Sequence, residues 1–395
     1  MEKIKRIIQG DKVIWVMAIM LALISMLAVY SASESYANNR FHGSNAFVLL
    51  KHSALLLAGL LAMAGTSCVQ YRRYAKILSA LFWVSLPLLL LTIVLGRNLN
   101  SASRVIGIGF ISFQTSDLAK VTLVGYLAMV LTQEREQMSS LKYLLKRVIV
   151  PILAAVGLIF PENFSTAALL FAVCLVMMFI GRVKMKYILG FVGTIVLVGG
   201  LAVFIMYKIG EANPETTNRA STWVHRIQRF LADDEEVDND ANFQVMQSKV
   251  AIAGGGVIGK SPGKSTQRNV LPHPYSDFIY AIILEEYGLA GGIFVLLIYM
   301  IILFRATRIM IRAPQSFGAL LSFGLAFSLV MQAMVNMGVA VGLLPVTGQP
   351  LPFVSMGGTS LIFTGASIGM IISVTKDINK SDERTAEIEA AEADS

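Results

Sequence analysis

Apolar runs of about bilayer length recur along this chain, and they limit its possible folds more than any other feature. Residues are 55% hydrophobic and only 15% charged, so the sequence predicts a polytopic membrane protein and not a soluble enzyme. We expect an all-α fold with ten transmembrane helices. The apolar segments are 13–30, 46–65, 77–95, 118–131, 148–160, 167–180, 188–207, 278–304, 317–341 and about 355–374. The fourth, fifth and sixth are shorter than a full span.

Lysines and arginines predict the orientation of these helices. With a cytoplasmic N-terminus, twenty of them fall in inside segments, against Arg40, Arg97 and Arg104 in the short outside loops. The positive-inside rule then makes residues 1–12 cytoplasmic, 13–375 a ten-helix membrane domain, and 208–276 a large extracytoplasmic loop. The acidic tail, 376–395, is predicted to be cytoplasmic and disordered. The first apolar run is too long for a signal peptide, so we expect an uncleaved span.

The large loop leads straight into the eighth apolar segment through Leu271-Pro-His-Pro-Tyr-Ser-Asp277. Ser276 is a plausible N-cap for that helix, which would place the Asp277 carboxylate in its first turn at the outer water-lipid boundary. Glu285 and Glu286 follow about 12 Å deeper at 1.5 Å per residue. Ionisable groups at that depth are costly, so all three are functional candidates.

Three stretches of the loop have alternative interpretations. An apolar pattern at helical spacing in 223–231, with arginines on its other faces, predicts an amphipathic helix on the outer leaflet. The acidic run 233–240 lacks the glycine and final glutamate of a calcium loop, so a solvated loop is favoured. Residues 254–261 match the phosphate-loop pattern, but such a loop needs a strand before it and a helix after it, whereas here a helix precedes and Pro262 follows. The loop could still hold a phosphate through its backbone N–H groups and the nearby Lys260, Lys264 and Arg268.

Other charged residues lie in or beside the helices. Asp117 and Lys120 are three residues apart and are expected to pair. Arg104 is placed to meet a headgroup or to snorkel, while Lys51 must face a partner or water. Either lysine, Lys51 or Lys120, is a conceivable partner for Glu285. No cysteine or histidine cluster suggests a metal cage.

Residues 336–360 predict a re-entrant or extended loop whose backbone must be covered by protein or water. Their sequence is Asn-Met-Gly-Val-Ala-Val-Gly-Leu-Leu-Pro-Val-Thr-Gly-Gln-Pro-Leu-Pro-Phe-Val-Ser-Met-Gly-Gly-Thr-Ser. It resembles the C-terminal signature of the SEDS family (shape, elongation, division and sporulation). Further matches, in order, are Arg104 with 112–120, Gln244-x-x-Gln247-Ser248, Gly254-Gly255, and Asp277-Phe-Ile with Glu285-Glu286-x-Gly288. They extend over most of the membrane core. The sequence departs from the family near Asn163 and Ser165.

The resemblance implies a peptidoglycan glycosyltransferase that polymerises lipid II outside the membrane, beside a class B penicillin-binding transpeptidase. Within the family, the exact residues of the last two motifs favour the members that act in cell division. Such chemistry needs a base for the sugar hydroxyl and positive charge for the departing pyrophosphate. Asp277 is the expected base. Expected substrate-binding residues are Arg104, Lys120, Lys260, Lys264, Arg268, Gln244, Ser355, Gly357 and Gly358.

No cofactor is required by this scheme, although a divalent cation such as Mg²⁺ or Mn²⁺ could instead bridge Asp277 and the pyrophosphate. Expected partners are lipid II, the transpeptidase, other division proteins and membrane lipid, with no nucleic acid. Two other classes stay open. A lipid II flippase would depend on Lys51, Lys120 and Glu285 rather than Asp277, and a division scaffold would need none of them.

Overall fold

The computed structural model describes residues 10–33, 45–96, 106–108, 111–212, 240–272, 274–312 and 316–393. Its elements are, in chain order, α2 (Lys12–Ala32), α4 (Asn45–Cys68), α5 (Tyr71–Gly96), β1 (Ile106–Ile108), β2 (Ile111–Phe113), α6 (Thr115–Gln133), the 3-10 turn η1 (Arg135–Ser139), α7 (Leu141–Leu144), the π-helical turn η2 (Leu145–Ile149), α8 (Val150–Ile159), α9 (Phe164–Ile180), α10 (Met185–Ala212), α12 (Asp240–Gly255), the 3-10 turn η3 (Gln267–Asn269), α13 (Ile279–Arg312), α14 (Phe317–Ala340) and α15 (Ser360–Ala393).

Helix covers all or most of each apolar segment marked in the sequence. Within the described ranges, five helices are long and apolar enough to cross a membrane: 12–32, 46–68, 71–94, 279–312 and 317–340. Two more, 164–180 and 185–201, are apolar but shorter. The fifth predicted span is lengthened because α7, η2 and α8 form one continuous helical run from Leu141 to Ile159. A total of ten crossings stays a prediction.

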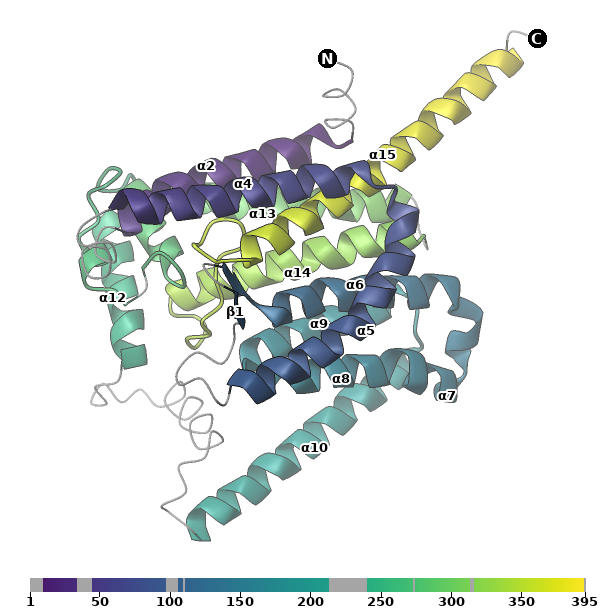
Figure 1. Ribbon diagram of the computed structural model, residues 1–395, viewed down its shortest axis with the longest axis horizontal. Coiled ribbons are helices and arrows are strands. Elements are labelled where there is room, and N and C mark those ends of the chain that lie inside the picture. Colours follow the sequence, from purple (N-terminus) through teal and green to yellow (C-terminus); the bar gives the residue numbers. More distant parts are fainter. Residues whose placement is uncertain are drawn as a thin grey trace.

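The helices form one bundle with α14 and α6 at its centre (Figure 1). In α14, 72% of the most apolar window is buried, against 28% in the corresponding windows of α4 and α5. Helices α2, α4, α13 and α15 pack on one side of this centre, and α5, α8 and α9 on the other. The charged groups of α6 and the polar side chains of α14 are therefore surrounded by protein rather than by lipid.

Helices α4 and α15 pack through glycines. A Cβ atom added at Gly365 would lie 2.1 Å from the carbonyl oxygen of Gly59, and one at Gly369 would lie 2.1 Å from Oγ1 of Thr66. Thr66 also donates a 3.1 Å hydrogen bond to the carbonyl of Ala366. Small residues spaced by four allow two membrane helices to approach closely. This contact fixes the start of α15, which lines the central cavity described below.

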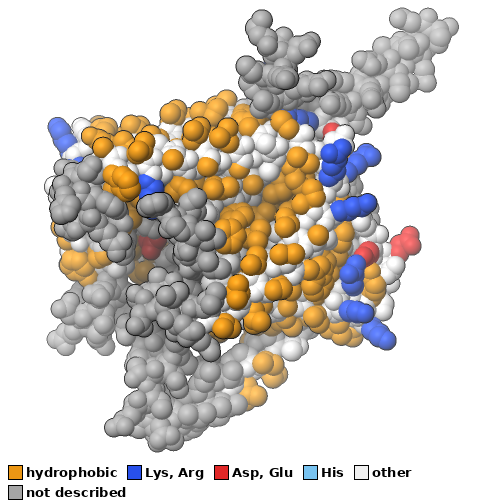
Figure 2. Space-filling model, viewed as in Figure 1, with side chains coloured by type: hydrophobic (Ala, Val, Ile, Leu, Met, Phe, Trp, Pro, Cys, Tyr) orange, Lys and Arg blue, Asp and Glu red, His pale blue; other side chains and the backbone are white. Residues whose placement is uncertain are grey.

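The outer surface of the bundle is apolar where lipid would contact it. Figure 2 shows hydrophobic side chains covering the middle of the molecule, with most of the visible Lys and Arg side chains at one end and a few at the other. Leu23 and Leu27 of α2, Leu61 of α4 and Leu90 of α5 are all more than half exposed. Exposed leucines of this kind match a hydrocarbon solvent, since water would disfavour so large an apolar surface.

The structure differs from the all-α expectation at one place and from the expected tail at another. Strands β1 and β2 form a small antiparallel hairpin before α6, with Gly107 opposite Ser112. Helix α15 continues to Ala393, although the sequence analysis predicts disorder from residue 376. Residues 381–393 are rich in alanine and glutamate, which favour helix even without tertiary contacts. The amphipathic stretch 223–231 and most of the acidic run 233–240 lie outside the described residues.

Candidate functional site

Asp277 lies in the turn that precedes α13, not inside the helix. Because α13 begins at Ile279, the prediction that Ser276 caps this helix is wrong. The Ser276 hydroxyl instead donates a 2.8 Å hydrogen bond to Oδ1 of Asp277. The aspartate is half-buried, and no lysine or arginine in the described part of the chain forms an ion pair with it. Its carboxylate therefore remains available to a ligand, next to the positive end of a helix dipole.

Asn336 of α14 fixes the backbone of this turn. Its Nδ2 atom donates to the carbonyl of Asp277 at 2.8 Å and to the carbonyl of Gln349 at 2.7 Å. The side chain is 1% exposed, and within the described structure its Oδ1 atom has no hydrogen-bond partner. No role for Asn336 follows from the sequence pattern. A polar amide at the end of an apolar helix is the signal that could have identified it.

Gln332 lies one turn earlier on α14 and connects the same loop to Lys120. Its Nε2 atom donates to the carbonyl of Pro350 at 2.9 Å, and its Oε1 atom accepts from Nζ of Lys120 at 3.0 Å. The predicted pair of Asp117 and Lys120 is confirmed, with 2.7 Å between Nζ and Oδ1. Both residues are buried. The positive charge of Lys120 is therefore largely compensated in this conformation.

The loop between α14 and α15 is irregular and buried, as the sequence predicts. Ser355 is the hub of its hydrogen bonds: its hydroxyl donates to the carbonyl of Ser276 at 2.6 Å and accepts from the N–H of Leu351 at 2.7 Å. The N–H of Met356 donates to the carbonyl of Tyr275 at 2.9 Å. Since the only proton of the hydroxyl is donated in these bonds, Ser355 positions the Asp277 turn. Its predicted contact with the substrate stays a prediction.

Asn163, where the sequence departs from the family pattern, joins the same network. Its side chain caps α9 by accepting from the N–H of Thr166 at 3.1 Å. Gln349 in the α14–α15 loop donates its amide to the Thr166 hydroxyl and more weakly, at 3.4 Å, to Oδ1 of Asn163. The start of α9 thus supports the loop that carries Gln349, and Asn163 has a structural function here.

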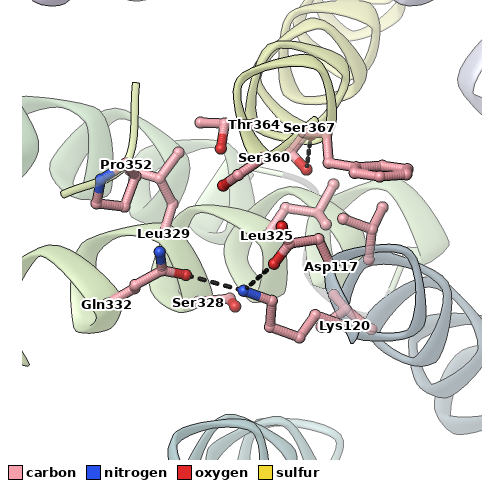
Figure 3. Close-up of a pocket in the computed structure, with 13 residues that line it drawn as sticks. Asp117, Lys120, Leu325, Ser328, Leu329, Gln332, Pro352, Ser360, Thr364 and Ser367 are labelled. Atoms are coloured by element: carbon pink, nitrogen blue, oxygen red, sulfur yellow. Dashed lines mark hydrogen bonds and ion pairs between the residues drawn. The ribbon is translucent and has the colours of Figure 1, made fainter. Parts of the chain in front are cut away.

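A cavity of about 40 Å³, with both polar and apolar walls, lies beside the ion pair of Lys120. In Figure 3, Nζ of Lys120 lies between Asp117 and Gln332, while Ser360, Thr364 and Ser367 of α15 lie across the cavity. Leu325, Leu329 and Pro352 supply apolar walls. This volume holds a few water molecules, so a sugar would enter only after α6, α14 and α15 separate.

Glu285 and Glu286 are buried, as predicted, but the partner of Glu285 is not the expected one. Glu285 is fully buried and pairs with Lys260 at 2.7 Å, so the suggested partners Lys51 and Lys120 are wrong. It also accepts the N–H of Thr266 at 3.1 Å and the hydroxyls of Ser265 and Thr266. A fully buried carboxylate needs a counter-ion and several donors to offset its lost hydration, and the nearby loop provides them.

The glycine-rich loop after α12 is joined to α13 by exchanged backbone hydrogen bonds. Gly288 has φ 68° and ψ −170°, which interrupts α13. The N–H groups of Lys260 and Ser261 donate to the carbonyls of Glu285 and Glu286, while Leu289 and Ala290 donate to residues 256 and 257. The N–H groups of Lys260 and Ser261 are therefore occupied within the protein, and binding of a phosphate by the rest of this loop stays a prediction.

A family model for cell cycle proteins, which takes in FtsW, RodA and SpoVE, matches residues 11–380. The chain belongs to this family. Membership together with the long apolar helices makes it a multi-pass membrane protein.

Relatives of this family member cover nearly its whole length. The probable peptidoglycan glycosyltransferase FtsW of Geobacter sp. (strain M18) is 33% identical over 376 residues, 94% of this chain and 98% of that protein. Stage V sporulation protein E of Bacillus subtilis (strain 168) is 31% identical over 381 residues, 93% of this chain and 97% of that protein.

Solved structures show the same fold. A chain from a peptidoglycan synthase complex that coordinates polymerization and crosslinking superposes with a TM-score of 0.70 at 25% identity, covering 93% of this chain and 98% of that one. The rod shape determining protein RodA of Thermus thermophilus gives a TM-score of 0.62 at 24% identity, covering 93% and 97%.

The remaining predicted site residues of this family member are dispersed. Gln244 is half-buried on α12, with no hydrogen bond to Asp277 in the described structure, and the neighbouring Ser248 anchors α12 to the carbonyl of Ala340 at 2.6 Å. Lys264 and Lys51 are exposed, and Arg268 is half-buried with Nη1 3.4 Å from the Ser31 hydroxyl. Gly357 and Gly358 are half-buried at the start of α15. Arg104 lies outside the described residues.

Proposed function

We propose that this protein is a peptidoglycan glycosyltransferase that polymerises lipid II on the outer face of the cytoplasmic membrane during septal wall synthesis. The observation that carries the proposal is the Asp277 carboxylate, which has no cationic partner among the described residues and whose backbone is fixed by Asn336 and by Ser355 through Ser276. The relatives named peptidoglycan glycosyltransferase support it.

In the proposed reaction Asp277 acts as general base. The acceptor sugar hydroxyl forms a bond to the anomeric carbon of the donor, its proton passes to the Asp277 carboxylate, and the bond from that carbon to the pyrophosphate oxygen breaks. The electron pair leaves with the undecaprenyl pyrophosphate. A base must approach the hydroxyl to about 2.6–3.2 Å, and a carboxylate at the end of an apolar helix is at the right depth for a lipid-linked sugar.

The leaving pyrophosphate needs positive charge. Lys260 compensates Glu285 and Lys120 compensates Asp117, which leaves Lys264 as the exposed loop cation among the candidates described. We assign the pyrophosphate to Lys264 together with Arg104. Lys120 then acts as a positioning residue, because it holds Gln332 and through it the loop at Pro350.

A divalent cation is the alternative source of charge. Magnesium usually binds one or two carboxylates together with substrate phosphates and keeps several waters. Asp277 with the bound pyrophosphate fits such a site, whereas the described residues contain no cluster of three metal-binding side chains. The metal would therefore arrive with the substrate, and Asp277 would be its protein ligand.

The buried pair of Asp117 and Lys120 is the observation that favours a flippase, because charges inside a bundle suit a transport path. These charges neutralise one another, and Glu285 is neutralised by Lys260. Asp117, Lys120 and Glu285 therefore offer no uncompensated charge to a moving headgroup. For this reason the flippase function is supported less well than the glycosyltransferase function.

The proposal is tested by feeding lipid II to the purified protein in complex with a class B penicillin-binding transpeptidase. Asp277→Asn keeps the shape of the side chain and removes the base, so glycan synthesis should fall by about 10²-fold or more. Ser276→Ala removes only the hydrogen bond to the carboxylate and should cost much less. Unaltered chain growth in Asp277→Asn would remove the base assignment, and growth lost with the complex intact would exclude a scaffold-only function.

A further inference from the structure

A second pocket lies at the end of the bundle opposite the Asp277 turn, where α2 begins, α13 ends and α15 passes. Its volume is about 250 Å³, and the side chains that decide its chemistry are Asp11, Lys12, Arg305, Arg308, Arg312 and Thr375. The positive-inside pattern predicts that this end faces the cytoplasm. No residue of the Asp277 site contributes to this pocket.

The pocket is cationic because three arginines of α13 share one face. Residues 305, 308 and 312 follow at spacings of three and four, which places them on neighbouring turns of the same side. Lys12 at the start of α2 adds a fourth cation. Against these four there is one carboxylate, Asp11, so the lining has a net charge of three positive units.

The single carboxylate is already fully used. Oδ2 of Asp11 accepts from Nε of Arg305 at 2.5 Å, and Oδ1 caps α2 by accepting from the N–H of Val13 at 2.9 Å. The N–H of Asp11 donates to the Thr375 hydroxyl at 3.0 Å, which ties α2 to α15. Within the described structure, Lys12, Arg308 and Arg312 form no ion pair, and Arg308 only lies 6.0 Å from the ring of Phe304.

The helices that line the pocket also carry exposed apolar side chains close to it in sequence. Val16 of α2 is 49% exposed, and Phe304 and Ile311 of α13 are 60% and 68% exposed. Figure 2 shows the hydrophobic surface ending where Lys and Arg side chains gather. The pocket therefore lies at the depth where a phospholipid carries its phosphate, with room for acyl chains along the apolar surface below it.

We propose that this pocket binds the phosphate of an anionic phospholipid from the cytoplasmic leaflet. Arginine matches phosphate because its planar group donates two parallel hydrogen bonds, and basic pockets between membrane helices on this side suit anionic headgroups. The bound lipid would contact α2, α13 and α15 together. It would add to the contact of Asp11 with Arg305 and Thr375 in holding the three helices at this end.

The test compares the lipid retained by the full-length wild type and by a variant that lacks two of the cations. Each protein is released from nanodiscs of phosphatidylcholine that contain one-fifth phosphatidylglycerol or diphosphatidylglycerol, and the lipid that stays bound is measured by native mass spectrometry. Arg308→Gln/Arg312→Gln removes two cations that form no ion pair among the described residues and leaves the Asp11–Arg305 pair intact. Each cation contributes about 1 kcal/mol to binding an anionic surface, so retained anionic lipid should fall by about tenfold or more. Zwitterionic lipid should be retained equally by both proteins.

The matched control is Arg73→Gln/Arg182→Gln, which removes two exposed arginines from the same predicted side but outside the pocket. An equal loss of anionic lipid in this control would overturn the site, since only net charge would then matter. Inorganic phosphate that raised the thermal stability of the wild type as much as the lipid did would overturn the lipid assignment in favour of a soluble phosphate. Both variants are checked by gel filtration, and binding is measured without lipid II.

Discussion

Gln332 and Asn336 occupy successive turns of α14, and their side-chain amides donate to the carbonyls of the adjacent residues Pro350 and Gln349. Because residues four apart lie on the same helix face, the two amides act as a pair that holds one irregular loop. Gln332 connects the loop to Lys120, and Asn336 connects it to the backbone of Asp277. The interior ion pair and the proposed base are thus linked through a single helix.

The first prediction concerns the hold of Gln332 on the α14–α15 loop. Gln332→Leu would leave the carbonyl of Pro350 without its donor and remove an acceptor from Lys120. Each buried polar group left unsatisfied costs about 1–3 kcal/mol, so we expect a lower unfolding temperature and slower glycan synthesis. Ser328→Ala alters the wall of the same cavity and should change both quantities much less. Equal effects of the two variants would show that the hydrogen bonds of Gln332 do not hold the loop.

The second prediction separates the structural and substrate roles of Lys120. Asp117→Asn alone leaves a buried ammonium without its carboxylate, and breaking such a pair costs about 3–5 kcal/mol. The double variant Asp117→Asn/Lys120→Met should regain most of that stability. If Lys120 contributes only by compensating Asp117, the double variant should also regain much of its polymerisation activity, because Gln332 still donates to the carbonyl of Pro350. A stable double variant with no activity would instead show that the Lys120 ammonium itself is needed, either for its bond to Gln332 or for the substrate.

The third prediction concerns the loop bound to α13. Glu285→Ala removes the acceptor of Lys260, Ser265 and Thr266, so the amide of Thr266 should exchange its hydrogen faster by about tenfold or more, because each lost bond is worth about 1 kcal/mol. Hydrogen exchange followed by mass spectrometry measures this directly. Lys249→Met, an exposed change on α12, is the control. Unchanged protection of the loop in Glu285→Ala would show that the carboxylate does not hold it.

The fourth prediction uses the contact between α4 and α15. Gly365→Ala would place a methyl group against the Gly59 carbonyl, and overpacking of this kind costs about 1–3 kcal/mol. The control is Gly193→Ala on α10, where the added methyl group meets nothing within 4 Å. There the higher helix propensity of alanine should stabilise slightly. Unfolding of both proteins in detergent, followed by circular dichroism, distinguishes the two outcomes.

The fifth prediction concerns acid stability. The Arg147 guanidinium hydrogen-bonded to Glu134 lowers the pKa of that carboxyl below its ordinary value of 4.5. The pair therefore stabilises the fold at pH values above the ordinary pKa, and this contribution is lost as pH falls through the lower folded value. It is partly exposed, so its contribution is below about 1 kcal/mol. The unfolding temperatures of wild type and Glu134→Gln should differ at pH 7 and converge toward pH 3.

Much of the site could be predicted from local pattern. The pair of Asp117 and Lys120 follows from helix spacing, and the burial of Glu285 and Glu286 follows from their place in an apolar run. Lys260 could not be predicted as the partner of Glu285, because 25 residues separate them and the loop returns to α13 only through the break at Gly288. Asn336 and Gln332 were missed because their partners are backbone carbonyls, which every residue has.

The sequence by itself determined the helical membrane fold, its family and the place of Asp277 at the start of an apolar helix, because these depend on the length and periodicity of apolar runs and on short motifs. Only the tertiary structure decided which charges are compensated. Lys120 and Lys260 have buried carboxylates beside them, whereas Asp277, Arg308 and Arg312 have no ion-pair partner within the described residues. The cost of burying a charge depends on the neighbours that packing brings to it, and those neighbours come from distant parts of the chain.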